Sequence, residues 1–279
     1  YYVASFQSKN DISIGQVLRR LPGITVSDAG QISYKGQPIK NFYIEGLDLM
    51  KGRYGIATNN IDPNSISTIE VLENHQDIKA LKDLKPEERA SINLKLKSGV
   101  KGVFNLIATL GGGYVDKLLW DNELITTYFQ RNSQLLATYK GNNSGTDLES
   151  ELRSHTDYDY SRTSTISDIA MPATPGINKR YYYFNQSHSA TYNQVFRVGK
   201  NGELGINAAY LNDRDERSNQ SVTTTLLPDG SKNVVDESFN GILHRNIANG
   251  NITYMQNTER NYIKEQVKLD WLSTDGYSN

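Results

Sequence analysis

The pattern of apolar residues changes once along this chain of 279 residues, close to the segment 97–102. Before that segment, short apolar stretches with helical and with strand spacing are mixed; after it, long stretches carry apolar residues at every second position. Mixed short elements predict a small α+β domain, and long alternation predicts antiparallel strands with one apolar face. We therefore expect an α+β domain over residues 1–100 and about seven antiparallel strands over residues 101–279.

The α+β domain is expected to contain one clear helix among short strands. Apolar residues with helical spacing predict one buried helix stripe, formed by Ile14, Val17, Leu18 and Leu21. Pro22 and Gly23 end this helix. Strands are expected at 24–26, 31–34, 41–44, 68–72 and 92–96, and single helical turns at 63–66 and 78–81. A glycine-containing loop is expected between Gly46 and Pro63.

The seven later strands are expected at 103–110, 119–130, 134–140, 181–198, 203–212, 250–256 and 261–273. In the fifth, Leu204, Ile206, Ala208 and Tyr210 alternate with Glu203, Gly205, Asn207 and Ala209. In the last, the polar face holds Lys264, Gln266, Lys268 and Asp270. A transmembrane barrel requires this alternation, with apolar residues toward lipid and polar residues toward the lumen. A soluble sandwich with one wet face shows it too, so periodicity alone leaves both open.

The lengths of the connections favour the barrel. Short connections at 131–133, 199–202 and 257–260 alternate with longer ones at 111–117, 141–180 and 213–249. Outer-membrane barrels have short periplasmic turns and long extracellular loops. Trp120 and Trp271 would then lie at the outer membrane interface. On this interpretation Ile206→Arg costs more than Asn207→Arg, because a lumen residue reaches water or polar groups of the first domain.

Seven strands do not close a barrel around a domain of this size. Bacterial single-chain barrels have even strand numbers, and large outer-membrane transporters have about 22 strands. We therefore expect an incomplete barrel that is the N-terminal part of a longer chain. A long apolar helix is not expected to cross the membrane, because no apolar run approaches the roughly 20 residues that one needs.

Composition excludes several classes of function. The chain has no Cys, so disulfide and thiolate chemistry are absent, and Lys+Arg 30 against Asp+Glu 31 argues against a nucleic-acid partner. Four histidines are scattered without metal-ligand spacing: His75, His155, His188 and His244. No catalytic constellation or phosphate-binding loop is visible, so we expect neither an enzyme nor a cofactor.

The connection 141–180 holds the candidate ligand contacts. Its acidic residues Asp147, Glu149, Glu151, Asp157 and Asp159 either hold a hard cation such as Ca²⁺ or form a solvated extracellular loop. Tyr158 and Tyr160 either stack on a ligand or order the loop. The candidate ligand-contacting residues are therefore Asp157, Tyr158, Asp159 and Tyr160.

Four segments of the first domain carry a family resemblance. In chain order they are SIGQVLRRLPGITV, GQISYKGQPIKNFYIEGLDL, SISTIEVLENHQDIKALKD and SINLKLK. They resemble the plug domain of TonB-dependent outer-membrane receptors. In their residues they most resemble the Bacteroidota branch of that family. The resemblance covers about residues 1–110, beyond which only the strand pattern carries it.

The resemblance implies a plug domain followed by the first strands of a transmembrane β-barrel in the bacterial outer membrane. It implies import of a nutrient ligand, with a plug of low local stability that mechanical pulling opens in part. The implied partners are outer-membrane lipid, an inner-membrane TonB-type energising complex, an extracellular ligand of unknown identity and a possible surface lipoprotein. The alternatives are a non-transporting barrel that serves as a binding or secretion scaffold, and a soluble periplasmic protein with a sandwich fold.

Overall fold

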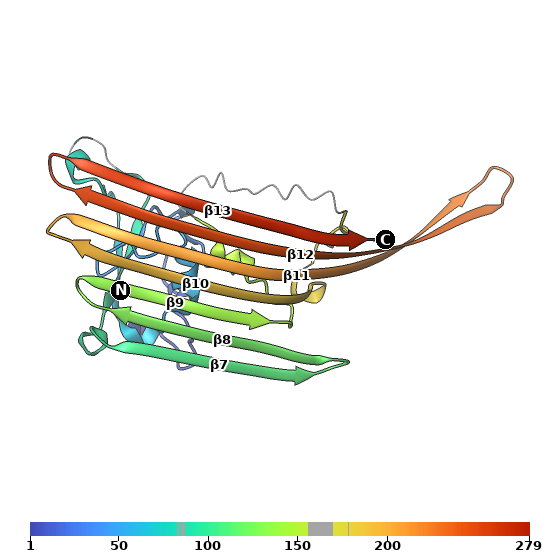
Figure 1. Cartoon of the computed structure of the whole chain (residues 1–279), viewed down its shortest axis with the longest axis horizontal. Coiled ribbons are helices and arrows are strands. Elements are labelled where there is room, and N and C mark those ends of the chain that lie inside the picture. Colours follow the sequence, from blue (N-terminus) through green and yellow to red (C-terminus); the bar gives the residue numbers. More distant parts are fainter. Residues whose placement is uncertain (83, 85–86, 156–169, 178) are drawn as a thin grey trace.

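The computed structural model describes residues 1–82, 84, 87–155, 170–177 and 179–279. In this part the chain forms an N-terminal unit of short elements, residues 1–100, and a single seven-stranded sheet, which we call the wall (Figure 1). The N-terminal unit lies against one face of the wall, which we call the inward face; the opposite face is the outward face. The N-terminal unit lies near the end of the wall that carries the turns 130–132, 199–201 and 258–261.

The N-terminal unit combines two small sheets with short helices. Its elements are η1 (Val3–Ser5), α1 (Ile14–Leu18), β1 (Ile24–Val26), β2 (Ile32–Tyr34), β3 (Gln37–Pro38), β4 (Phe42–Ile44), α2 (Tyr54–Asn60), η2 (Pro63–Ser65), β5 (Ile66–Leu72), η3 (Lys79–Leu81), β6 (Ser91–Leu96) and η4 (Ser98–Val100). One sheet has the order β1-β2-β3 and is antiparallel. The other has the order β4-β6-β5, with β4 parallel and β5 antiparallel to β6.

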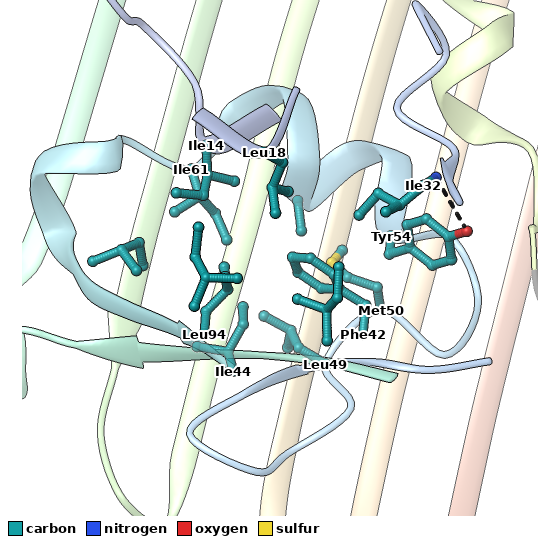
Figure 2. Packing of buried hydrophobic residues seen from close by; sticks show 14 of the residues in the cluster. Ile14, Leu18, Ile32, Phe42, Ile44, Leu49, Met50, Tyr54, Ile61 and Leu94 are labelled. Atoms are coloured by element: carbon teal, nitrogen blue, oxygen red, sulfur yellow. Dashed lines mark hydrogen bonds between the residues drawn. The ribbon is translucent and has the colours of Figure 1, made fainter. Parts of the chain in front are cut away.

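The core of the unit forms where α1, α2 and the second sheet meet (Figure 2). Phe42 stacks on Tyr54 with ring centroids 5.8 Å apart, and both side chains are buried. Ile14 and Leu18, from the predicted helix stripe, are fully buried in the same cluster. The expected short strands and both helical turns are present, with ends shifted by one or two residues.

Helix α2 was not expected, because its sequence YGIATNN has low helix propensity. Packing overrides that preference: Tyr54, Ile56 and Ala57 are buried. Gly55 is required there, since a Cβ at this position would lie 2.4 Å from the Ala29 carbonyl oxygen. The turn that holds Ala29 and helix α2 therefore approach more closely than a side chain would permit.

The wall is an antiparallel meander in which each strand pairs with the next. Its strands are β7 (Phe104–Tyr114), β8 (Leu118–Phe129), β9 (Ser133–Asn142), β10 (Phe184–Val198), β11 (Gly202–Leu226), β12 (Lys232–Asn257) and β13 (Tyr262–Ser278). Two short helices, η5 (Glu149–Leu152) and η6 (Lys179–Tyr181), lie in the connection between β9 and β10. No helix of the described residues is both long and apolar enough to cross a membrane.

Two of the three expected long connections are instead strand. Strand β7 continues through Gly111–Gly113 to Tyr114, so the turn to β8 covers only residues 115–117. Strands β11 and β12 pair without interruption out to Leu226 and Lys232, and Asp229 and Gly230 lie in the turn. The expected strict alternation of short and long connections is therefore wrong, and the barrel interpretation needs other support.

The β11–β12 hairpin extends beyond its neighbours. The pairing of β10 with β11 ends at Glu216, and that of β13 with β12 ends at Gly241. Residues 217–240 therefore form a two-stranded ribbon that projects past the wall, as Figure 1 shows. Its β-branched residues and its Asp-Gly turn are typical of a hairpin, and Gly230 has the positive φ of 82° that such a turn requires.

Alternate residues of the wall lie on opposite faces, with the expected parity. On β11, Gly205, Asn207 and Ala209 are buried on the inward face, whereas Ala208 and Tyr210 are exposed on the outward face. The predicted division of this strand into two faces is confirmed. The soluble sandwich is not supported, because the inward face is covered by the N-terminal unit and not by a second sheet of comparable size.

Candidate functional site: the interface between the N-terminal unit and the wall

The inward face of the wall is polar although it is buried. Its buried polar side chains are Thr127, Gln134, Thr138, Lys140, Asn142, Asn185, Ser187, Ser189, Thr191, Asn193, Asn207, Asp213, Asp215, Asn251 and Thr253. Buried polar groups need hydrogen-bond partners, since an unpaired one costs about 1–3 kcal/mol. Here the partners come from the wall itself and from the backbone of the N-terminal unit.

Two amide side chains make the central contacts across this interface. Gln134 Nε2 donates to the carbonyl oxygen of Ile44 at 2.8 Å, and Asn207 Nδ2 donates to that of Leu49 at 2.9 Å. Within the described part of the chain, the other amide atoms, Gln134 Oε1 and Asn207 Oδ1, are buried without a partner. The contact is therefore polar and incompletely satisfied on the side of the wall.

Three apolar wall residues complete the central contact. Phe129, Leu136 and Val195 are fully buried and join the core cluster of the N-terminal unit. They lie on β8, β9 and β10. The N-terminal unit thus docks through a small apolar area that polar side chains surround.

A lysine of the N-terminal unit approaches the inward face of β11. Lys51 Nζ lies 3.5 Å from Glu203 Oε2, and a Cβ on Gly205 would lie 3.1 Å from Lys51 Cε. Gly205 therefore makes room for this side chain. Nearby, burial raises the pKa of Asp48 above its ordinary value. The charge of Lys51 and the hydrogen bond from its backbone N–H oppose this rise.

Asn257, the last residue of β12, ties the N-terminal unit to the short-turn end of the wall. Asn257 Nδ2 donates to the carbonyl oxygen of Asp77 at 2.6 Å, and its Oδ1 accepts from the backbone N–H of Lys79 at 3.0 Å. The Lys79 ammonium also donates to Asn201 Oδ1 in the neighbouring turn at 3.3 Å. The segment 77–79 is therefore held at the short-turn end of the wall.

We expect Asn257→Ala to release this segment, because it removes a donor and an acceptor together. The loss should be about 1–2 kcal/mol of local stability, seen as faster hydrogen exchange of the Lys79 amide. Asn201→Ala is the matched control, since it removes only the contact to an exposed ammonium and should change this exchange by less than about 0.5 kcal/mol. Equal effects of the two variants would contradict the assigned role of Asn257.

A buried ionic cluster lies farther along the inward face, beyond the N-terminal unit. Asp213 accepts from Tyr183, from Ser187 Oγ at 2.7 Å and from Arg245. Arg245 also donates to Glu149 Oε2 at 2.9 Å. Burial, followed by the charge of Asp213, raises the pKa of the Tyr183 hydroxyl. The sequence interpretation missed this cluster by placing Asp213 in a loop, although the alternation from Asn207 extends to it.

The sequence-predicted site residues are placed as follows. Asp157, Tyr158, Asp159 and Tyr160 lie outside the described residues. Among the described acidic residues of the same connection, each pairs with a different cation: Asp147 with Lys179, Glu149 with Arg245 and Glu151 with Lys140. No group of three metal-ligating side chains occurs in the described part of the chain. Glu149 and Glu151 are thus paired with residues of the wall, and Asp147 with a residue of the same connection.

Three of the four histidines pack against aromatic rings. His75 contacts Tyr43 edge to face, His155 is tilted against Tyr54, and His188 stacks on Trp120. His188 Nδ1 also lies 2.9 Å from the Tyr139 hydroxyl. The three rings therefore have separate aromatic neighbours: one in the N-terminal unit for His75, one in helix α2 for His155 and one in strand β8 for His188.

Comparison with known proteins gives likenesses to solved structures alone. No protein-family model matches the chain, and no curated protein matches it. The ferripyoverdine receptor of the Pseudomonas aeruginosa outer membrane is 14% identical and matches 94% of this chain and 40% of its own, with a TM-score of 0.29. The alcaligin outer-membrane receptor FauA of Bordetella pertussis is 14% identical and matches 95% of this chain and 44% of its own, with a TM-score of 0.27.

A third structure, a mutant of the ferric enterobactin receptor PfeA of Pseudomonas aeruginosa, is 11% identical and has a TM-score of 0.32. The match covers 99% of this chain and 45% of that receptor. The chain thus spans less than half the length of each of these three proteins. Scores of this size do not assign the chain to a family.

Proposed function

We propose that the chain is the N-terminal part of a TonB-dependent receptor that imports a nutrient ligand across the bacterial outer membrane. In this proposal the wall is the first part of a transmembrane β-barrel, and the N-terminal unit is the plug in its lumen. The proposal rests on the distribution of polar and apolar residues over the two faces of the wall.

The outward face of the wall is apolar and uncovered. Its apolar residues that are at least 40% exposed include Phe104, Leu106, Leu110, Leu124, Tyr139, Tyr192, Tyr210, Ile252, Ile263, Val267, Leu269 and Trp271. The inward face is polar, and on β8 to β12 much of it is buried, which is the reverse of a water-soluble fold. Soluble proteins rarely expose a continuous apolar surface of this extent, whereas a barrel in a membrane presents one to lipid. This inversion favours outer-membrane lipid as the partner of the outward face.

The contact with the N-terminal unit fits a plug that must open. The contacts that hold the unit include hydrogen bonds to backbone carbonyls, the Lys51–Glu203 ion pair, Asn257 and three apolar residues, and they are not a broad apolar interface. Each such hydrogen bond contributes only about 0.5–1.5 kcal/mol net, because water replaces it on opening. The sequence resemblance supports the other parts of the proposal: the TonB-type energising complex, the extracellular ligand, a surface lipoprotein partner and the Bacteroidota branch.

The test follows opening of the interface in living cells. Thr253 is 1% exposed on the inward face, and the chain has no other thiol that would react when Thr253 is replaced by cysteine. In the full-length protein, we expect Thr253→Cys to react with maleimide faster in cells with an active TonB-type complex than in cells without one. Labelling that is independent of the complex would contradict import and would favour the non-transporting scaffold.

A further inference from the structure

The connection between β9 and β10 returns to the N-terminal unit before it reaches β10. Its residues 148–155, which we call the strap, include the short helix η5. Leu148 is buried, and Leu152 packs against the core cluster of the N-terminal unit. The strap therefore connects two strands of the wall in the sequence, but it packs on the N-terminal unit as well as on the wall.

Two glutamates attach the strap to the inward face of the wall. Glu149 Oε2 accepts from Arg245 of β12 at 2.9 Å, and Glu151 Oε1 accepts from Lys140 of β9 at 2.9 Å. The Lys140 and Arg245 side chains are only 9% and 13% exposed. Ion pairs shielded from water to this degree are screened less by salt than pairs on an open surface.

The strap also contacts helix α2 and the turn before it. Glu151 accepts from Asn59 Nδ2 at 3.3 Å and from Asn60 Nδ2 at 3.5 Å. The backbone N–H of His155 donates to the Gly52 carbonyl oxygen at 2.9 Å. The His155 ring lies on Tyr54 with centroids 5.1 Å apart, and burial lowers the pKa of His155, which favours the neutral ring.

Glu151 is the point at which these two sets of contacts meet. Its carboxylate receives Lys140 from the wall and both asparagines from α2. Helix α2 has seven residues and no side-chain hydrogen bond at its N-cap. A helix this short is not stable by itself, so its stability comes from what packs on it. The strap supplies part of that packing through Glu151 and Leu152.

We propose that the strap couples the β9–β10 connection to the N-terminal unit through Glu151. Displacing the strap loosens α2, while the contacts of Asn257 at the short-turn end remain. The coupling between the strap and α2 requires only the contacts described above. A role of this coupling in the control of import rests on the proposed function. A ligand that moves the β9–β10 connection would then loosen the N-terminal unit at α2.

The coupling is tested by hydrogen exchange of the full-length protein in lipid nanodiscs. We expect Glu151→Gln to accelerate exchange of the amides 54–60 about tenfold or more, which corresponds to about 1.4 kcal/mol. Glu149→Gln is the matched control: it lies in the same helix and contacts Arg245 of the wall, so the same amides should stay within about twofold of the unmodified protein. Exchange that is unchanged in Glu151→Gln, or equally fast in both variants, overturns the proposal.

Loss of folding is distinguished from loss of coupling by the amides of β4 and β6. They should exchange at the unmodified rate in Glu151→Gln, and an acceleration equal to that of α2 overturns the proposal. Asn59→Asp, which places a second carboxylate beside Glu151, should reproduce the acceleration from the other side of the contact. In cells, Glu151→Gln should raise labelling of Thr253→Cys. If amide exchange of α2 rises in Glu151→Gln and labelling of Thr253→Cys does not, the coupling stands and its role in import is rejected. If labelling of Thr253→Cys never depends on the energising complex, only the proposed function is rejected.

Discussion

Replacing Ile206 by arginine is expected to make folding of the full-length protein into a lipid bilayer less favourable by about 2–4 kcal/mol. Ile206 lies on the outward face of β11 between Leu204 and Ala208, and it pairs with Ile252 of β12. A charge at this position would lie among apolar side chains that have no polar partner to offer. The measurement is the folding free energy of the two proteins in bilayers, from denaturant titration.

Gln266→Arg is the control for this variant. Val267 pairs with Ile252, so Gln266 lies at nearly the same level of the wall as Ile206, but it is exposed on the inward side. Its replacement should cost less than about 1 kcal/mol, because the new charge reaches water. A penalty as large as that of Ile206→Arg would show that the outward face does not meet lipid.

Asn207 does not serve as this control, although the sequence suggested it. The side chain is 2% exposed and donates to the Leu49 carbonyl oxygen and to Asn193. Arginine at this position would be forced against the N-terminal unit and would not reach water directly, so its cost does not isolate the effect of lipid. The face of Asn207 was predictable from alternation, but its contact with another part of the chain was not.

Replacing Phe42 by alanine is expected to lower the stability of the N-terminal unit by about 3–5 kcal/mol. The ring is 2% exposed, stacks on Tyr54 and fills the centre of the core between β4 and α2. Its removal takes away apolar contacts and leaves a cavity that the short strands around it do not close. The measurement is the opening free energy of the β4 and β6 amides by native-state hydrogen exchange in the full-length protein.

Ile12→Ala is the control within the same unit. Ile12 is 79% exposed and precedes α1, so its loss should change the opening free energy by less than about 0.5 kcal/mol. If Phe42→Ala were as mild as Ile12→Ala, the cluster around Phe42 would not be the core that holds the unit together.

Local patterns predicted those elements whose signals lie within a few residues. Helix α1 follows from the spacing of apolar residues, but it ends at Leu18, before the expected Pro22–Gly23 stop, and Leu21 lies in the turns after it. The short strands follow from turn residues on either side. Helix α2 was missed because its signal is not local: Gly55 is there to let Ala29 approach, and Ala29 is distant in sequence. Propensity alone assigned that stretch to a loop.

Composition misled the interpretation of the segment 213–249. Its many polar residues suggested a loop, yet they continue the alternation of β11 and β12, and the Asp-Gly turn was a hairpin signal. Reading it as a strand would have placed Asp213 on the inward face. The pairing of Asp213 with Arg245 still required the register between β11 and β12, which no local pattern contains.

The candidate interface was predictable in kind and not in detail. Alternation predicted a polar face toward the first domain, and the structure confirms this on β9, β10 and β11. The specific partners, such as Gln134 with Ile44, depend on how the two parts dock. Sequence offers no rule for this, because an amide side chain binds any carbonyl oxygen that it reaches.

The unpaired amide oxygens of Gln134 and Asn207 make wetting of the interface inexpensive. When water enters, these two atoms gain partners that the closed state does not give them, which offsets part of the loss of the bonds to Ile44 and Leu49. Closure then reverses the exchange, since the same donors return to the carbonyl oxygens of Ile44 and Leu49. An interface of this kind favours repeated separation and rejoining of two folded surfaces, without requiring either surface to unfold.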